Sequence, residues 1–196
     1  MPKLCTVQEE IYTHEHLWRS STALAELVES DAEGSYRLLL PAVMTTFLAY
    51  EAFINFCGYI LLPELWAQEK ENFKGKSLED KLAKICAKLP KFIWLKGEPP
   101  YQTIKNLSGF RELVAHGKVQ VNEYVAEQKK DATHFTFSHQ WDSYLTADQL
   151  SLFRNDVKKF CEALLVAMRE CSDYPHIIFP AFEGSLASGE SVSHAG

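Results

Sequence analysis

The most apolar long stretch in the sequence is VMTTFLAYEAFINFCGYILL, residues 43–62. About 20 apolar residues are enough for a helix to cross a bilayer. Glu51 and Asn55 lie near the middle of the stretch, where strongly polar side chains are costly in lipid. No second stretch of this kind and no flanking cluster of Lys and Arg accompanies it. We therefore expect no membrane span, but a central helix buried in a bundle.

The rest of the chain supports a helical bundle. The apolar stretch belongs to a helix expected over about residues 36–62, with Pro41 as an early kink or restart. Apolar residues at helical spacing predict four more helices, over about residues 6–31, 78–89, 101–116 and 146–171. Residues 64–76 are polar and are expected to form a connection. The sequence thus predicts an all-α fold, an up-and-down bundle of about five helices in a single domain over residues 1–182.

Local signals mark several helix ends. SLED, residues 77–80, is a variant of the capping box, and Thr146 precedes the last helix. Pro90 and Gly117 are suited to end the helices before them. These signals place GFRELVAHGK, residues 109–118, at the end of the fourth helix.

Two segments are expected to lie outside the bundle. Residues 118–145 include VQVNEYV, which alternates, and HFTFSHQW, which is aromatic. They predict a short β-prone insertion before the last helix, either irregular or a hairpin. Residues 183–196 are rich in Ser, Gly and Ala, so we expect a disordered tail there.

Charge and cysteine content narrow the function classes. The formal net charge of -6 argues against a broad basic surface for nucleic acid, but leaves room for a small local basic site. The five cysteines are scattered with no CxxC pair, which argues against a structural zinc site or a redox motif. Reduced thiols, together with an N-terminus that lacks the apolar core of a signal peptide, predict a cytoplasmic protein.

The stretch GFRELVAHGK carries the main functional signal, because Arg111 and His116 form an R-x4-H pattern near the end of a core helix. This pattern, the helix order and the acidic residue in AYEAFIN of the second helix resemble the HEPN superfamily (higher eukaryote and prokaryote nucleotide-binding domains). The resemblance covers about residues 6–172.

The resemblance implies a metal-independent endoribonuclease, related to toxins or defence effectors, in which the RNA 2′-hydroxyl attacks the adjacent phosphate. Arg111 would stabilise the phosphate, since Arg makes bidentate contacts to phosphate oxygens. His116 would move the proton, since imidazole titrates near neutral pH. The resemblance also implies a homodimer in which two Arg–His pairs face one cleft, and it implies no cofactor.

Helix geometry complicates this interpretation. Residues five apart on an ideal helix lie roughly 140° apart, so Arg111 and His116 do not share a face. Either the Arg111 side chain extends around the helix toward His116, or the helix unwinds before Gly117. Glu112 and His116 are four apart and do share a face. Glu112 is a departure from the family pattern, and it places a negative charge beside the presumed phosphate site.

Two polar residues of the second helix are candidates to support the Arg–His pair. Glu51 and Asn55 are four apart and share a face, and a buried carboxylate needs a partner. Arg111 is the natural partner for Glu51, with Lys105 second. The pair could orient the Arg for phosphate, or it could be a closed structural salt bridge. Lys105 and Lys118 are candidates for contacts to the substrate.

The histidines outside this motif give no metal signature. His14 and His16 are two apart, so a helix directs them differently. His134 and His139 could meet across a hairpin, but no Asp, Glu or Cys stands close enough in sequence to complete a site. We therefore expect packing or surface histidines and no metal site.

A second function remains open from the sequence. The chain could be a non-catalytic HEPN module that binds nucleotide, RNA or a partner protein of the antitoxin kind. Net acidity and Glu112 favour this module, whereas the intact R-x4-H favours the nuclease.

Overall fold

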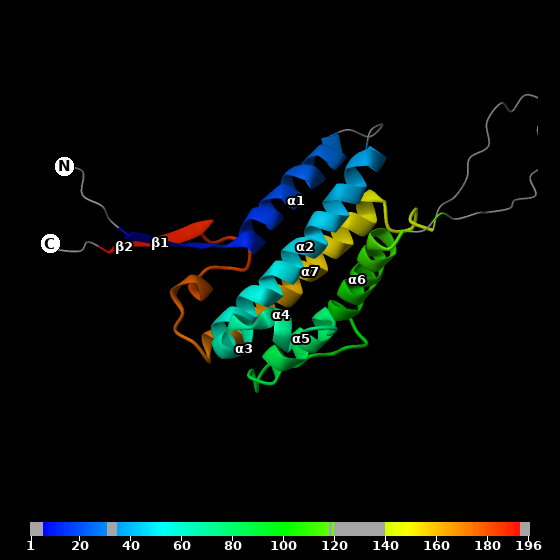
Figure 1. Ribbon diagram of the computed structural model, residues 1–196. Helices are drawn as coiled ribbons and strands as arrows, with labels where there is room; N and C mark the ends of the chain where they lie inside the picture. The colour runs from blue at the N-terminus through cyan, green and yellow to red at the C-terminus, as the bar shows by residue number, and fades with distance from the viewer. Residues whose placement is uncertain (1–5, 31–34, 118, 120–139, 193–196) are drawn as a thin grey trace, which may run out of the picture.

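The computed structural model describes residues 6–30, 35–117, 119 and 140–192 (Figure 1). In these ranges the elements are, in chain order, β1 (Thr6–Ile11), α1 (Thr13–Ser30), α2 (Ser35–Leu61), α3 (Pro63–Ala67), α4 (Glu69–Asn72), α5 (Leu78–Cys86), α6 (Tyr101–Ala115), α7 (Ala147–Arg169), the 3-10 helix η1 (Pro175–Ile178) and β2 (Ala187–Val192). The all-α bundle is confirmed, and the five predicted helices correspond to α1, α2, α5, α6 and α7.

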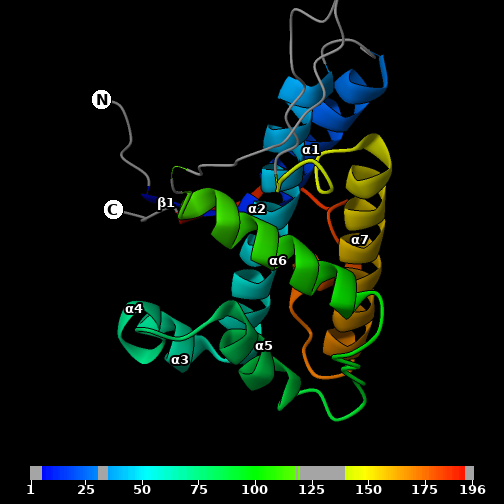
Figure 2. The same ribbon diagram turned by 90° about the vertical axis from the view of Figure 1, so that its right-hand side faces the viewer.

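Helix α2 lies at the centre of the bundle. It packs along α1 and against α7, and α6 lies across α2 and α7 (Figures 1 and 2). Phe53 of α2, Phe110 of α6 and Phe153 of α7 are among the largest fully buried side chains. Burying such side chains supplies much of the stabilisation of a fold of this kind.

The apolar stretch of α2 accounts for this central position. Over Tyr36–Leu61 the helix is long and apolar enough to cross a membrane, and half of its most apolar window is buried inside the fold. Core helices of bundles pass the same test. The helix runs without interruption through Pro41, so that residue lies inside the helix and does not restart it.

The predicted caps are present. The side chain of Ser77 accepts a hydrogen bond from the backbone N–H of Asp80, and Asp80 accepts one from the backbone N–H of Ser77. The Thr146 hydroxyl accepts a hydrogen bond from the backbone N–H of Gln149, 3.1 Å away, at the start of α7. Each cap satisfies N–H groups that a helix start leaves without intrahelical partners.

The prediction that one helix covers residues 6–31 is wrong at its beginning. Thr6–Ile11 is the strand β1, and the helix starts only at Thr13. The prediction of a disordered tail is also wrong for Ala187–Val192, which is the strand β2. The two strands pair antiparallel, with Thr6 opposite Val192 and Ile11 opposite Ala187, and project together beside the bundle (Figure 1). Each strand is stabilised by hydrogen bonds to a partner far away in sequence, which local patterns do not reveal.

The expected connection over residues 64–76 contains two short helices, α3 and α4. Trp66 of α3 packs against Phe73, with ring centroids 4.8 Å apart, and lies directly over Gly58 of α2. Because the segment is mostly polar, the sequence did not predict that these two aromatic side chains would pack against each other.

Most of the predicted β-prone insertion, residues 118–145, lies outside the described residues. Of that range, only residue 119 and residues 140–145 are described, and the latter form turns and bends before α7.

Candidate functional site

The R-x4-H residues are joined by the residue between them. Arg111 forms an ion pair with Glu112, and Nε2 of His116 lies 3.3 Å from the other carboxylate oxygen of Glu112. Helix α6 ends at Ala115, so His116 is the C-terminal cap and has left the helical conformation. The backbone N–H of His116 still donates to the carbonyl of Glu112 at 3.0 Å, so the last helical hydrogen bond is kept at this end. Glu112 thus connects a guanidinium and an imidazole that an ideal helix would hold apart.

The three side chains differ in exposure. Arg111 is 31% exposed, whereas Glu112 is 54% and His116 75% exposed. The guanidinium of Arg111 lies over the Phe47 ring of α2, 5.6 Å from its centroid, a cation–π arrangement. This contact fixes the Arg against the bundle and leaves the His open to solvent.

The predicted partnership between Glu51 and Arg111 is not formed. Glu51 is half-buried on α2 and makes no ion pair with any residue in the described part of the chain. Asn55 instead accepts a hydrogen bond from Lys81 of α5, at 3.0 Å, and Lys81 also pairs with Glu69 of α4. Asn55 therefore belongs to a polar link between helices, which is the structural interpretation that the sequence left open.

The two lysines proposed for substrate contact have different outcomes. Lys105 is exposed on α6, two turns before Arg111. Lys118 lies outside the described residues.

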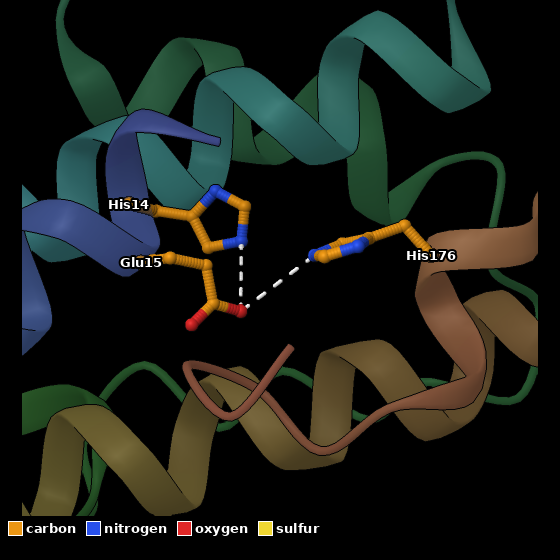
Figure 3. A group of neighbouring side chains, drawn as sticks. All are labelled: His14, Glu15 and His176. Atoms are coloured by element: carbon orange, nitrogen blue, oxygen red, sulfur yellow. Dashed lines mark ion pairs between the residues drawn. The ribbon is translucent and has the colours of Figure 1, made fainter. Parts of the chain in front are cut away.

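A second group of titratable side chains lies elsewhere, buried between α1 and η1. His14 and Glu15 come from the first turn of α1, and His176 comes from η1 (Figure 3). Oε1 of Glu15 lies 3.9 Å from Nε2 of His14 and 3.6 Å from Nε2 of His176. The three side chains are 1% to 8% exposed, so they share a site shielded from water.

The chain around residues 182–184 closes over this group. The backbone N–H of Gly184 donates to Oε1 of Glu15 at 2.9 Å. A Cβ at position 184 would lie 2.5 Å from the His176 ring, so only glycine fits there. Phe182 has φ of 68°, a left-handed conformation that costs a non-glycine residue free energy. It stacks on Trp18, with ring centroids 4.3 Å apart.

The electrostatics of the buried group are unusual. Burial is the main cause that lowers the pKa of His14 to about 4, although Glu15 opposes this effect. His14 is therefore a neutral imidazole at neutral pH. The second oxygen of Glu15, Oε2, is buried and has no hydrogen-bond partner among the described residues. Such an oxygen is costly unless something compensates it.

A hollow of about 410 Å³ opens beside His14. Its polar lining includes Glu10, which accepts hydrogen bonds from the hydroxyls of Tyr12, Tyr59 and Tyr174. The bond to Glu10 is the largest cause that raises the pKa of Tyr59. Since His14 also lines the hollow, one member of the buried group lies next to an opening toward solvent.

The sequence could not reveal this buried group. In the sequence, the histidine nearest to His14 is His16, and His16 is exposed on the other side of α1. The actual neighbours of His14 are Glu15, next to it in sequence, and His176, brought by the C-terminal segment. The one available signal was the dipeptide HE, residues 14 and 15, which is too short to distinguish from chance.

Comparisons of the chain with protein-family models, with curated proteins and with solved structures find no match.

Proposed function

We propose that this protein is a HEPN-like, metal-independent endoribonuclease of the toxin or defence kind, acting in the cytoplasm. The observation that carries the proposal is the connected group Arg111–Glu112–His116 at the open end of α6. It provides a permanent cation and an imidazole that lie close enough together to contact the same phosphodiester.

The chemistry follows from the three side chains. Arg111, held against Phe47, binds the non-bridging phosphate oxygens and stabilises the negative charge that develops on them. His116 takes the proton of the 2′-hydroxyl or gives one to the leaving 5′-oxygen. Glu112, whose carboxylate lies 3.3 Å from Nε2 of His116, holds the imidazole ring in place, as a third group does for many catalytic imidazoles. The exposed Lys105 is placed to contact flanking phosphates.

A single Arg–His pair supplies one imidazole, whereas the reaction needs both a base and an acid. We therefore propose a homodimer in which two copies of the group face one cleft. Leu48 of α2 is 39% exposed, one turn from the half-buried Glu51, and gives this face of α2 an apolar contact. Light scattering after gel filtration is expected to give the mass of a dimer, and Leu48→Glu is expected to shift it toward a monomer.

The test is cleavage of labelled RNA in the presence of EDTA, with folding followed by circular dichroism. We expect the native protein to cut RNA and to leave 2′,3′-cyclic phosphate ends. Arg111→Ala and His116→Ala are each expected to reduce the rate by about 100-fold or more, as removal of a charge-stabilising or proton-transferring group does.

Two matched controls remove the same residue types elsewhere. Arg37→Ala takes away an exposed Arg of α2, and His16→Ala an exposed His of α1. Both are expected to cut RNA at the native rate. Equal cleavage by His116→Ala and the native protein would refute the proposed mechanism.

A second candidate function is a non-catalytic HEPN module that binds nucleotide, RNA or an antitoxin-like partner protein. The pairing of Glu112 with Arg111 favours it, because a phosphate must compete with this carboxylate for the guanidinium. RNA binding that depends on Arg111, without cleavage by folded native protein, would support the module and exclude the nuclease.

A further inference from the structure

The buried carboxylate of Glu15 lacks an evident compensating charge. It is 1% exposed, and in the described ranges only His14 and His176 lie within ion-pair distance of it. The backbone N–H of Gly184 satisfies Oε1 in part, but Oε2 has no partner there. A buried carboxylate is costly unless it is hydrogen-bonded and paired with a positive charge, and a bound cation would supply that charge.

The positions of the three side chains fit a transition-metal ion. Their ligand atoms all lie within 4.8 Å of one another, and the two distances to Glu15 are 3.9 and 3.6 Å. Two ligand atoms on one tetrahedral zinc ion, each about 2.0–2.2 Å from the metal, lie roughly 3.3–3.6 Å apart. The distance from Glu15 to His176 already matches this spacing, and a movement of the His14 side chain toward the other two would bring all three ligand atoms to it.

We propose that His14, Glu15 and His176 bind a zinc ion. Two imidazoles and one carboxylate are a ligand set that zinc uses, and a water molecule would fill the fourth tetrahedral position. The residues around the three ligands are compatible with such a site. Tyr12 stacks on the His176 ring at 3.7 Å, and the glycine at 184 lets the chain pass close to two of the ligands.

The ion would join two distant parts of the chain. His14 and Glu15 begin α1, whereas His176 belongs to η1, which leads toward β2. Zinc bound to the folded chain and not to the unfolded chain stabilises the fold by mass action. The ion would therefore stabilise the docking of η1 on α1, independently of the proposed nuclease group on α6.

The experiment uses the full chain without a polyhistidine tag. The protein is treated with a chelator, loaded with Zn²⁺, desalted and measured by elemental analysis, and its melting temperature is recorded before and after loading. We expect a stoichiometric amount of zinc and a rise in melting temperature of several degrees. Loading with Co²⁺ is expected to produce the visible absorption of a four-coordinate cobalt site.

His176→Phe keeps an aromatic ring to stack on Tyr12 but removes a ligand, so zinc and the cobalt absorption are expected to be lost. His16→Ala, which removes an exposed histidine two residues from His14, is the matched control and is expected to bind as the native protein does. If His176→Phe does not fold, Glu15→Gln keeps the acceptor for Gly184 and is expected to weaken zinc binding at least tenfold.

Two results would overturn the proposal. Folded native protein that retains no zinc and melts at the same temperature with and without it would show that no metal ion compensates Glu15. Undiminished zinc in folded His176→Phe or Glu15→Gln would place the metal elsewhere in the chain.

Discussion

Gly58 is the residue at which a single methyl group should matter most. A Cβ there would lie 2.1 Å from the Trp66 ring, whose position on α3 is fixed by Phe73. We expect Gly58→Ala to reduce the free energy of unfolding by about 1–3 kcal/mol, because the overlap outweighs the gain in helix propensity. Urea denaturation followed by circular dichroism measures this change.

The control for that substitution is Gly109 of α6, where a Cβ would meet no heavy atom of the described residues within 4 Å beyond its own helix backbone and chain neighbours. Gly109→Ala is expected to raise the free energy of unfolding by up to about 1 kcal/mol, since alanine favours the helix. Equal effects at the two glycines would show that α3 moves aside without cost.

Glu112 offers a test of the phosphate site that does not depend on catalysis. Glu112→Gln removes the carboxylate paired with Arg111, so RNA should bind about two- to fivefold more tightly at low salt, as expected for one surface charge. Fluorescence anisotropy with labelled RNA gives the affinity. Glu64→Gln, an exposed acid on α3, is the control and should change it little. Unchanged affinity in Glu112→Gln would separate Arg111 from RNA binding.

The capping box at the start of α5 makes a pH-dependent contribution to stability. Hydrogen bonds from the backbone and side chain of Ser77 hold the pKa of Asp80 below its ordinary value of 3.8. The contribution of this carboxylate is therefore complete above about pH 4 and is lost as the pH falls through the lowered folded-state pKa.

Asp80→Asn is accordingly expected to melt at a lower temperature than the native protein at neutral pH, because the amide caps the helix less well. The difference should shrink as the pH falls toward about 3. Thermal melts across this range provide the measurement, and a difference that stays constant with pH would contradict the assignment to the ionised carboxylate.

At the scale of elements, the sequence predicted the features that depend on interactions between residues close together in the chain. Periodic apolar residues marked the helices, and Ser77 and Thr146 marked their starts, since these features act within one or two turns. The sequence predicted a helix where β1 lies, because the strand that pairs with β1 lies near residue 190. His176 was not recognised for the same reason, because only the folded chain brings it beside Glu15. The proximity of Glu112 and His116 was predicted because they are four apart on one helix, whereas Arg111 pairs with Glu112 and not with Glu51, the partner that the sequence suggested.

At the scale of the molecule, the two-stranded sheet fixes the C-terminal segment beside the bundle. Among described residues, β1 pairs only with β2. Removal of residues 187–196 should therefore leave the helical content intact and abolish the protection of the β1 amides, because the core side chains belong mainly to the helices. Hydrogen exchange read by mass spectrometry distinguishes the two regions. Protection of β1 that survives the truncation would mean that another segment covers it.

The pairing of Thr6 with Val192 has a consequence for synthesis. A ribosome delivers the first strand long before the second, so the strand waits while residues 12–186 are made. During that interval its backbone N–H and C=O groups are open to other strands. The helices form from near neighbours and need not wait, whereas the sheet and the docking of η1 on α1 come last. A chain that is released before residue 187 is added would therefore form a nearly complete bundle with an unpaired strand at its side.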